Sequence, residues 1–173
     1  MVIRRAAAND VPVLAALIDG FAKGHPAEGI ARSVDRMRDA FFGSQSVGHV
    51  LLAERNGVAI GFGAWRRMFD VYWSMYGGEA IALYVRPSHR GVGIPACIIA
   101  TMCAEVRENG GHFIRTSYGP ELASLYERVG VGGDERSCHV SARAFEKLAD
   151  TAGGSAREII RALPDKKLNY EAV

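Results

Sequence analysis

Apolar residues recur at helical spacing in three stretches of the chain, and this pattern predicts three main helices. The first is expected to follow Asn9 or Asp10, either of which can serve as its N-cap, and the second to follow Ser33. The third is expected to begin at Ile94 and to end at the Asn-Gly-Gly sequence that starts at Asn109. The apolar positions that support these helices are Val13, Leu14, Leu17 and Ile18, then Val34, Met37 and Phe41, and finally Ile94, Ile98, Met102 and Val106.

Between the second and third helices the pattern changes to runs typical of β-strands. Residues 49–55 and 58–69 form two such runs, joined by the dipeptide Asn56-Gly57. This dipeptide favours a type I′ hairpin, because both residues adopt positive φ angles easily. The sequence therefore predicts an antiparallel hairpin here.

A further strand is expected over residues 79–85, after a turn near Tyr76, Gly77 and Gly78. With the hairpin it makes an antiparallel meander of three strands. A short strand over residues 2–5 precedes the first helix.

The last part of the chain alternates strands and short helices. Strands are expected over 112–118 and 137–145, and helices over 120–130, 145–150 and 155–163. We expect one domain over residues 1–150, followed by a helical appendage and tail over 151–173 that packs on the domain or on a partner subunit.

Composition leaves few special classes of protein open. The 173 residues carry a formal net charge of +2, and the basic residues are scattered, so nothing supports a nucleic-acid partner. No stretch is long and apolar enough to span a membrane, and no signal peptide is evident, so we expect a cytoplasmic protein.

Cysteine and histidine spacing predicts no metal site. The three cysteines, Cys97, Cys103 and Cys138, form no C-x-x-C pair, and the five histidines are dispersed. We expect reduced, buried thiols; a nucleophilic cysteine is the alternative.

The segment from His89 to Ala100 is the main candidate for a binding site. It places Arg90, Gly91 and Gly93 directly before an apolar helix, and the free N–H groups and dipole of a helix N-terminus favour a phosphate. No Lys-Ser or Lys-Thr follows, which excludes a P-loop. Gly91, Gly93 and Ala96 match the dinucleotide pattern G-x-G-x-x-G/A, but three β-type strands precede it and the next strand carries no acidic residue.

The surroundings resemble instead the acyl-CoA pyrophosphate loop of the GNAT N-acetyltransferase superfamily. The family pattern R/Q-x-x-G-x-G/A falls on Arg90, Gly93 and Pro95, and the segment 121–130 resembles a later helix of the family. The resemblance covers roughly residues 2–148 and implies an α/β (α+β) fold, with a mixed, mostly antiparallel sheet flanked by helices. It also implies acetyl-CoA as co-substrate, with no metal. The residues it assigns to acetyl-CoA are Leu83, Tyr84, Val85, Arg90, Gly91, Val92, Gly93, Ile94 and Ala96.

Pro95 departs from the family pattern. It has no N–H, so one donor to the pyrophosphate is missing, at a cost of about 1.5 to 3 kcal/mol at most. Proline also suits the first position of a helix. We expect weakened or rearranged phosphate contacts, with acetyl-CoA still bound.

The family brings the amine directly to the thioester, which needs a base for the amine and an acid for the departing thiolate. By resemblance, Tyr126 is the acid, with Tyr118 in reserve. Glu79 is the candidate base, acting through a water; it is equally consistent with a solvated carboxylate. Asp70 and Asp134 are weaker alternatives.

Aromatic residues indicate the acceptor site. One interpretation is an aromatic wall that holds a cationic amine, with Asp70 supplying the charge; the other is a hydrophobic core with a homodimer contact. The residues concerned are Phe21, His25, Phe41, Phe42, Trp65, Phe69, Tyr72, Trp73 and Tyr76.

Two functions remain open. The first is an N-acetyltransferase that transfers the acetyl group of acetyl-CoA to a primary amine of a small molecule. The second is a GNAT-fold CoA-binding or regulatory module without turnover, to which Pro95 and the lack of acidic residues at Ile81 and Ala82 point.

Overall fold

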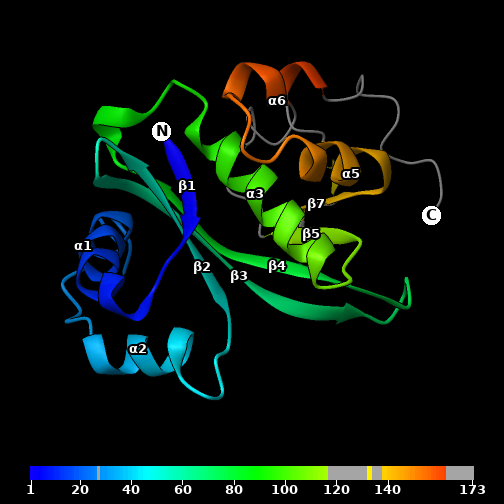
Figure 1. Cartoon of the computed structure of the whole chain (residues 1–173). Coiled ribbons are helices and arrows are strands. Elements are labelled where there is room, and N and C mark those ends of the chain that lie inside the picture. Colours follow the sequence, from blue (N-terminus) through cyan, green and yellow to red (C-terminus); the bar gives the residue numbers. More distant parts are fainter. Residues whose placement is uncertain (27, 117–131, 134–137, 163–173) are drawn as a thin grey trace.

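A twisted sheet with helices on both faces forms the molecule (Figure 1). The computed structural model describes residues 1–26, 28–116, 132–133 and 138–162. The strands in these residues are β1 (Val2–Arg5), β2 (His49–Arg55), β3 (Val58–Asp70), β4 (Met75–Val85), β5 (Phe113–Thr116), β6 (Gly132–Gly133) and β7 (Cys138–Ser141). They form a seven-stranded sheet in the order β1-β2-β3-β4-β5-β7-β6, in which only β4 and β5 pair in parallel.

The helices divide between the two faces of the sheet. Those described are α1 (Val11–Phe21), α2 (Val34–Phe42), α3 (Ile94–Glu108), α5 (Ala142–Asp150) and α6 (Ala156–Ala162). α1 and α2 cover one face, and α3, α5 and α6 cover the other (Figure 1). A separate hydrophobic core lies under each set. None of the described helices has both the length and the apolar content needed to cross a membrane.

This architecture confirms the mixed, mostly antiparallel sheet flanked by helices. At the hairpin between β2 and β3, Asn56 and Gly57 have φ angles of 52° and 75°, as a type I′ turn requires. The Ser33 hydroxyl accepts a hydrogen bond from the Arg36 N–H at 3.2 Å, so the predicted cap of α2 is present. The four apolar positions predicted for α3 are all at most 1% exposed.

The predicted turn near Tyr76 is wrong. The chain turns at residues 71–74, and Gly77 and Gly78 lie inside β4. A Cβ atom on Gly77 would come within 2.5 Å of the Phe113 ring, and one on Gly78 within 2.6 Å of Val106. These glycines therefore allow close packing of neighbouring side chains, a role that sequence alone does not separate from turn formation.

The predicted appendage packs on the domain. Ile159 of α6 is fully buried and belongs to the same core cluster as Ile98 of α3, and Ala156 packs against that cluster. In Figure 1, α6 lies beside the N-terminal half of α3.

Candidate functional site

The C-terminal half of β4 is paired on only one side among the described residues. β3 pairs with the whole strand, whereas β5 pairs only with Gly78, Glu79 and Ala80. Beyond Ala80, β4 therefore has an edge whose N–H and C=O groups face no described strand. The binding role of the backbone of Leu83, Tyr84 and Val85 stays a prediction.

A β-bulge explains why the strand changes direction at this point. Ala64 of β3 pairs with Ala82, while the next residue, Trp65, pairs with Ala80. Ile81 is therefore an extra residue in β4 and is 44% exposed. An extra residue bends a strand and redirects the groups around it. The bulge thus lies where a splayed strand is needed.

β4 is followed by a short 3₁₀ helix at Pro87–His89, and the loop from Arg90 to Gly93 then leads into α3. Gly91 and Gly93 have φ angles of 83° and 80°, in the left-handed region that favours glycine. These two glycines are therefore required by the path of the loop.

The backbone of this loop offers several free donors. Within the described part of the chain, the N–H groups of Gly91, Val92, Gly93 and Ile94 donate to no protein acceptor. They lie at the positive end of α3, a helix of 15 residues. An anion such as a pyrophosphate would find both hydrogen-bond donors and a favourable potential here.

Ala96 differs from the other predicted loop residues. Its N–H donates to the Gly93 carbonyl at 3.1 Å, so it is already engaged inside the first turn of α3. Pro95 occupies the second helical position rather than the first. The N–H that proline lacks is one of the orphan donors at a helix start, so α3 loses no internal hydrogen bond.

Arg90 is held at the end of β4. Its Nε donates to the Val85 carbonyl at 2.9 Å, and its guanidinium carbon lies 5.8 Å from the centre of the Tyr84 ring. The Tyr84 ring packs against Phe21 of α1 and Phe62 of β3, at 6.1 and 6.2 Å between ring centres. Its side chain therefore belongs to the core under α1, which leaves the backbone of Tyr84 as the part that could contact a ligand.

Glu79 lies on β4 between two arginines. Its Oε2 accepts from Arg66 Nε on β3 at 2.6 Å, and Arg115 is its register partner on β5. Oε1 has no hydrogen-bond partner in the described residues, and the side chain is 33% exposed. The carboxylate lies two residues before the bulge at Ile81, and its role as a base stays a prediction. Sequence reasoning missed Arg66 and Arg115, because only the strand register brings them to Glu79.

Asp70 does not fit the role of a free anion for an amine. It is 3% exposed, its Oδ1 accepts from the N–H groups of Tyr72 and Trp73 at 2.9 and 3.0 Å, and its Oδ2 pairs with Arg115. The Trp73 N–H, followed by Arg115, holds its pKa below the ordinary value. Asp70 is thus a structural carboxylate that orders the turn after β3.

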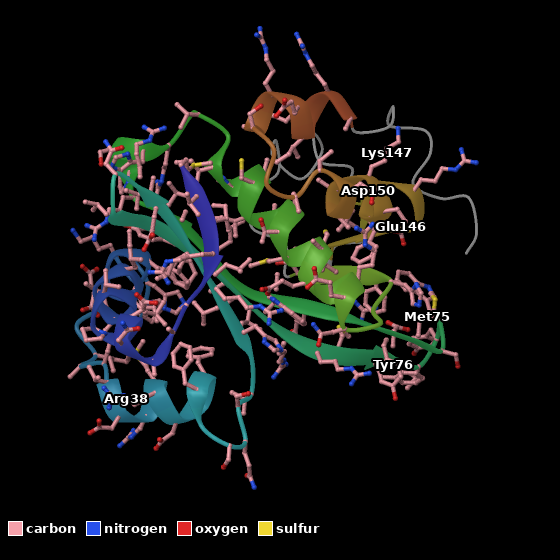
Figure 2. The ribbon with its side chains drawn as sticks, viewed as in Figure 1. Arg38, Met75, Tyr76, Glu146, Lys147 and Asp150 are labelled. Carbon is pink, nitrogen blue, oxygen red and sulfur yellow. The ribbon has the colours of Figure 1, made fainter. Side chains whose placement is uncertain are left out.

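The predicted aromatic wall divides into separate groups. Trp65 is 1% exposed and stacks on His49 at 4.3 Å between ring centres. Phe69 contacts Tyr76 at 5.1 Å beside the turn between β3 and β4, where Figure 2 labels Tyr76. Among the described residues of the set, Phe21 makes a ring contact with the C-terminal half of β4, through Tyr84. The alternative interpretation, a homodimer contact, stays a prediction. Tyr72 at 94%, Phe69 at 48% and Tyr76 at 48% remain exposed.

Two predicted thiols are buried and free. Cys97 and Cys103, both on α3, form no disulfide, and burial raises the pKa of each. Both are therefore protonated at neutral pH, which disfavours a covalent acyl-cysteine route. Tyr126, Tyr118 and Asp134 lie outside the described residues.

Comparison with known proteins agrees with this geometry. The sequence model of the acetyltransferase (GNAT) family matches residues 14–131. The chain belongs to this family. No curated protein sequence matches it significantly.

Solved structures of GNAT proteins share the fold. The protein yncA from Salmonella typhimurium, solved with its cofactor acetyl-CoA, is 22% identical, with 82% of this chain and 93% of that chain covered and a TM-score of 0.64. A ribosomal-protein-alanine N-acetyltransferase from Brucella melitensis is 19% identical (78% and 94% covered, TM-score 0.63). An aminoglycoside acetyltransferase from an uncultured soil metagenomic sample, in complex with sisomicin, is 17% identical (72% and 81% covered, TM-score 0.60).

Proposed function

We propose that this GNAT protein transfers the acetyl group of acetyl-CoA to a primary amine of a small molecule. The observation that carries the proposal is the set of N–H groups from Gly91 to Ile94 at the start of α3, which donate to no acceptor in the described residues, next to a strand end that no described strand pairs on its second side. The first feature suits the pyrophosphate of acetyl-CoA, and the second suits its extended pantetheine arm.

The chemistry is direct attack of the amine on the thioester carbonyl. The C–N bond forms while the carbonyl oxygen takes up negative charge, and an N–H on the segment Leu83, Tyr84 and Val85 stabilises this oxyanion. The C–S bond then breaks. Tyr126 gives its proton to the departing thiolate, and the amine loses a proton through a water to Glu79.

The choice of a small-molecule acceptor rests on two of the solved structures and on the distribution of charge in the sequence. Two soil metagenomic structures with the same fold are described as aminoglycoside acetyltransferases, whereas two from Brucella are described as ribosomal-protein-alanine N-acetyltransferases. We choose the small amine because the basic residues of this chain are scattered, so no basic surface indicates a ribosomal substrate.

The test is thiol release from acetyl-CoA with a panel of amines, combined with calorimetry of CoA binding. The panel contains diamines, amino acids, aminoglycosides and a peptide with an N-terminal alanine. Turnover of a small amine supports the proposal. Turnover of the peptide alone overturns the acceptor class. Binding without turnover indicates a CoA-binding module, and absence of binding overturns the whole proposal.

The role of Tyr126 has its own test. Tyr126→Phe is expected to lower kcat by about 100- to 10,000-fold, because the phenol proton is lost while the ring is kept. The KM for acetyl-CoA should change little. Full turnover by this variant, measured by thiol release over pH 6 to 9, would contradict the assignment of the acid.

A further inference from the structure

The C-terminal helix α6 packs directly against the glycine loop. A Cβ atom built on Gly93 would lie 2.3 Å from Ala156 Cβ, so the two backbones approach as closely as glycine permits. Ile159 is fully buried one turn later, and Cys97 Sγ lies 3.9 Å from the Gly154 carbonyl oxygen. The start of α6 is therefore fixed beside the residues proposed to bind phosphate.

A positive charge follows immediately after this contact. Arg157 is the next residue after Ala156, with Cα atoms about 3.8 Å apart, and its side chain is exposed. It forms no ion pair with any residue in the described ranges, unlike Arg107, which pairs with both Glu146 and Asp150. Arg157 is thus an exposed cation directly after the residue that contacts the loop.

The acidic residue of α6 is already committed. The Glu158 carboxylate accepts from the Ser155 N–H at 2.7 Å, and the Ser155 hydroxyl oxygen accepts from the Glu158 N–H at 3.3 Å, which together form a capping box. The Ser155 hydroxyl also lies 2.8 Å from the carboxylate. These bonds hold the pKa of Glu158 below its ordinary value. Its carboxylate is thus directed to its own helix end, and Arg157 keeps its charge for a ligand.

We propose that α6 forms one wall of the acyl-CoA site, with Ala156 positioning the glycine loop and Arg157 binding a phosphate group of CoA. This inference rests on the proposed function. A guanidinium suits the position because it binds phosphate through two N–H donors and stays charged at all relevant pH values. It also offsets part of the loss of the N–H at Pro95.

The main experiment compares Arg157→Gln with Arg161→Gln by calorimetry with CoA. Arg161 is a matched control, since it is exposed on the same helix but lies four residues, or about 6 Å, further along the axis. We expect Arg157→Gln to weaken CoA binding about tenfold, as loss of one charge-assisted contact implies. Arg161→Gln should bind CoA within about twofold of the wild type and keep its kcat.

Two further measurements separate the parts of the inference. With 3′-dephospho-CoA, a preserved effect of Arg157→Gln assigns the contact to the pyrophosphate, and a lost effect assigns it to the ribose phosphate. Ala156→Leu should weaken CoA binding, because the larger side chain displaces Gly93. Ala156→Gly adds no bulk and should bind CoA about as well as the wild type. Thermal unfolding of both variants is the control for folding.

The outcomes distinguish this inference from the proposed function. If the wild-type protein binds no CoA, the proposed function fails first. If the wild type binds CoA but Arg157→Gln and Ala156→Leu bind it equally well, the role of α6 is overturned and the proposed function stands.

Discussion

Gly93 meets two independent constraints at the point where the loop enters α3. Its φ of 80° disfavours any residue with a Cβ atom, and such an atom would lie 2.3 Å from Ala156. Gly91, two residues earlier, has a φ of 83° but open space around it. Gly91 is therefore required only for its backbone conformation, whereas Gly93 is required for its conformation and for its contact with Ala156.

Substitution by alanine should reveal this difference. We expect Gly91→Ala to lower the free energy of unfolding by about 1 to 2 kcal/mol, the cost of the left-handed conformation. Gly93→Ala should lose about 2 to 4 kcal/mol, because overpacking against Ala156 is added to that cost. Urea unfolding measures both values. Equal losses for the two variants would show that α6 does not press on the loop.

Glu79 is the residue for which a catalytic and a structural role are hardest to separate. Glu79→Gln keeps the size of the side chain and removes the base, so we expect kcat to fall by about 100- to 10,000-fold with little change in KM for acetyl-CoA. Arg66→Gln is the control, since it breaks the same 2.6 Å ion pair but leaves the carboxylate. Similar losses of kcat in both variants would show that the ion pair between Glu79 and Arg66, rather than proton transfer to Glu79, accounts for the loss of activity.

Among the elements, β4 links the fold to the site. Its N-terminal half is fixed by close packing of Gly77 on Phe113 and of Gly78 on Val106. Its C-terminal half is redirected by the extra residue Ile81. One strand thus has one end fixed in the core and, at the loop, an edge that no described strand pairs, so the donors of the proposed site would lie on a stable support.

The turn between β3 and β4 depends on Asp70, and its contribution should vary with pH. The Trp73 N–H, Arg115 and the Tyr72 N–H together lower the pKa of Asp70 from its ordinary value of 3.8. The folded state therefore binds the proton less tightly than the unfolded state does. The carboxylate stabilises the fold above about pH 4, and this contribution is lost as the pH falls through the lower folded-state pKa.

We therefore expect Asp70→Asn to lower the free energy of unfolding at pH 7 by about 1 to 3 kcal/mol. The difference from the wild type should shrink as the pH falls below 4. Asp35→Asn serves as a charge-matched control, because Asp35 is 89% exposed on the surface of α2 and should change stability by less than about 0.5 kcal/mol. A difference that stays constant from pH 7 to pH 2 in urea titrations would contradict this account.

At the scale of the molecule, local sequence patterns predict the helices and strands well. They predict little of the site, because the neighbours of its residues depend on strand register. The capped helix at Ser33 and the Asn56-Gly57 hairpin follow from local chemistry, and both are confirmed. The neighbours of Glu79 and the buried state of Asp70 depend on contacts between distant strands, which no local pattern carries. Gly77 and Gly78 were misinterpreted because a turn and a close contact select the same residue.

The role of α6 also depends on the whole molecule. The sequence predicts a helix there, but its contact with Gly93 follows only from the packing of Ile159 among the residues of α3. Because this packing is part of the main core, α6 should unfold together with the sheet rather than separately.

Ile159→Ala tests this cooperativity. Removing most of a fully buried isoleucine should cost about 2 to 4 kcal/mol of the free energy of unfolding.

The two tryptophans, Trp65 and Trp73, lie in β3 and in the turn that follows it, so their fluorescence reports on a region distant from α6 along the chain. If α6 belongs to one cooperative unit, the fluorescence midpoint in urea falls together with the helical circular dichroism signal. Ile30→Ala, at a position 57% exposed, should leave both midpoints almost unchanged. A variant at Ile159 that loses helical signal early while the tryptophan transition stays in place would show that α6 folds on its own.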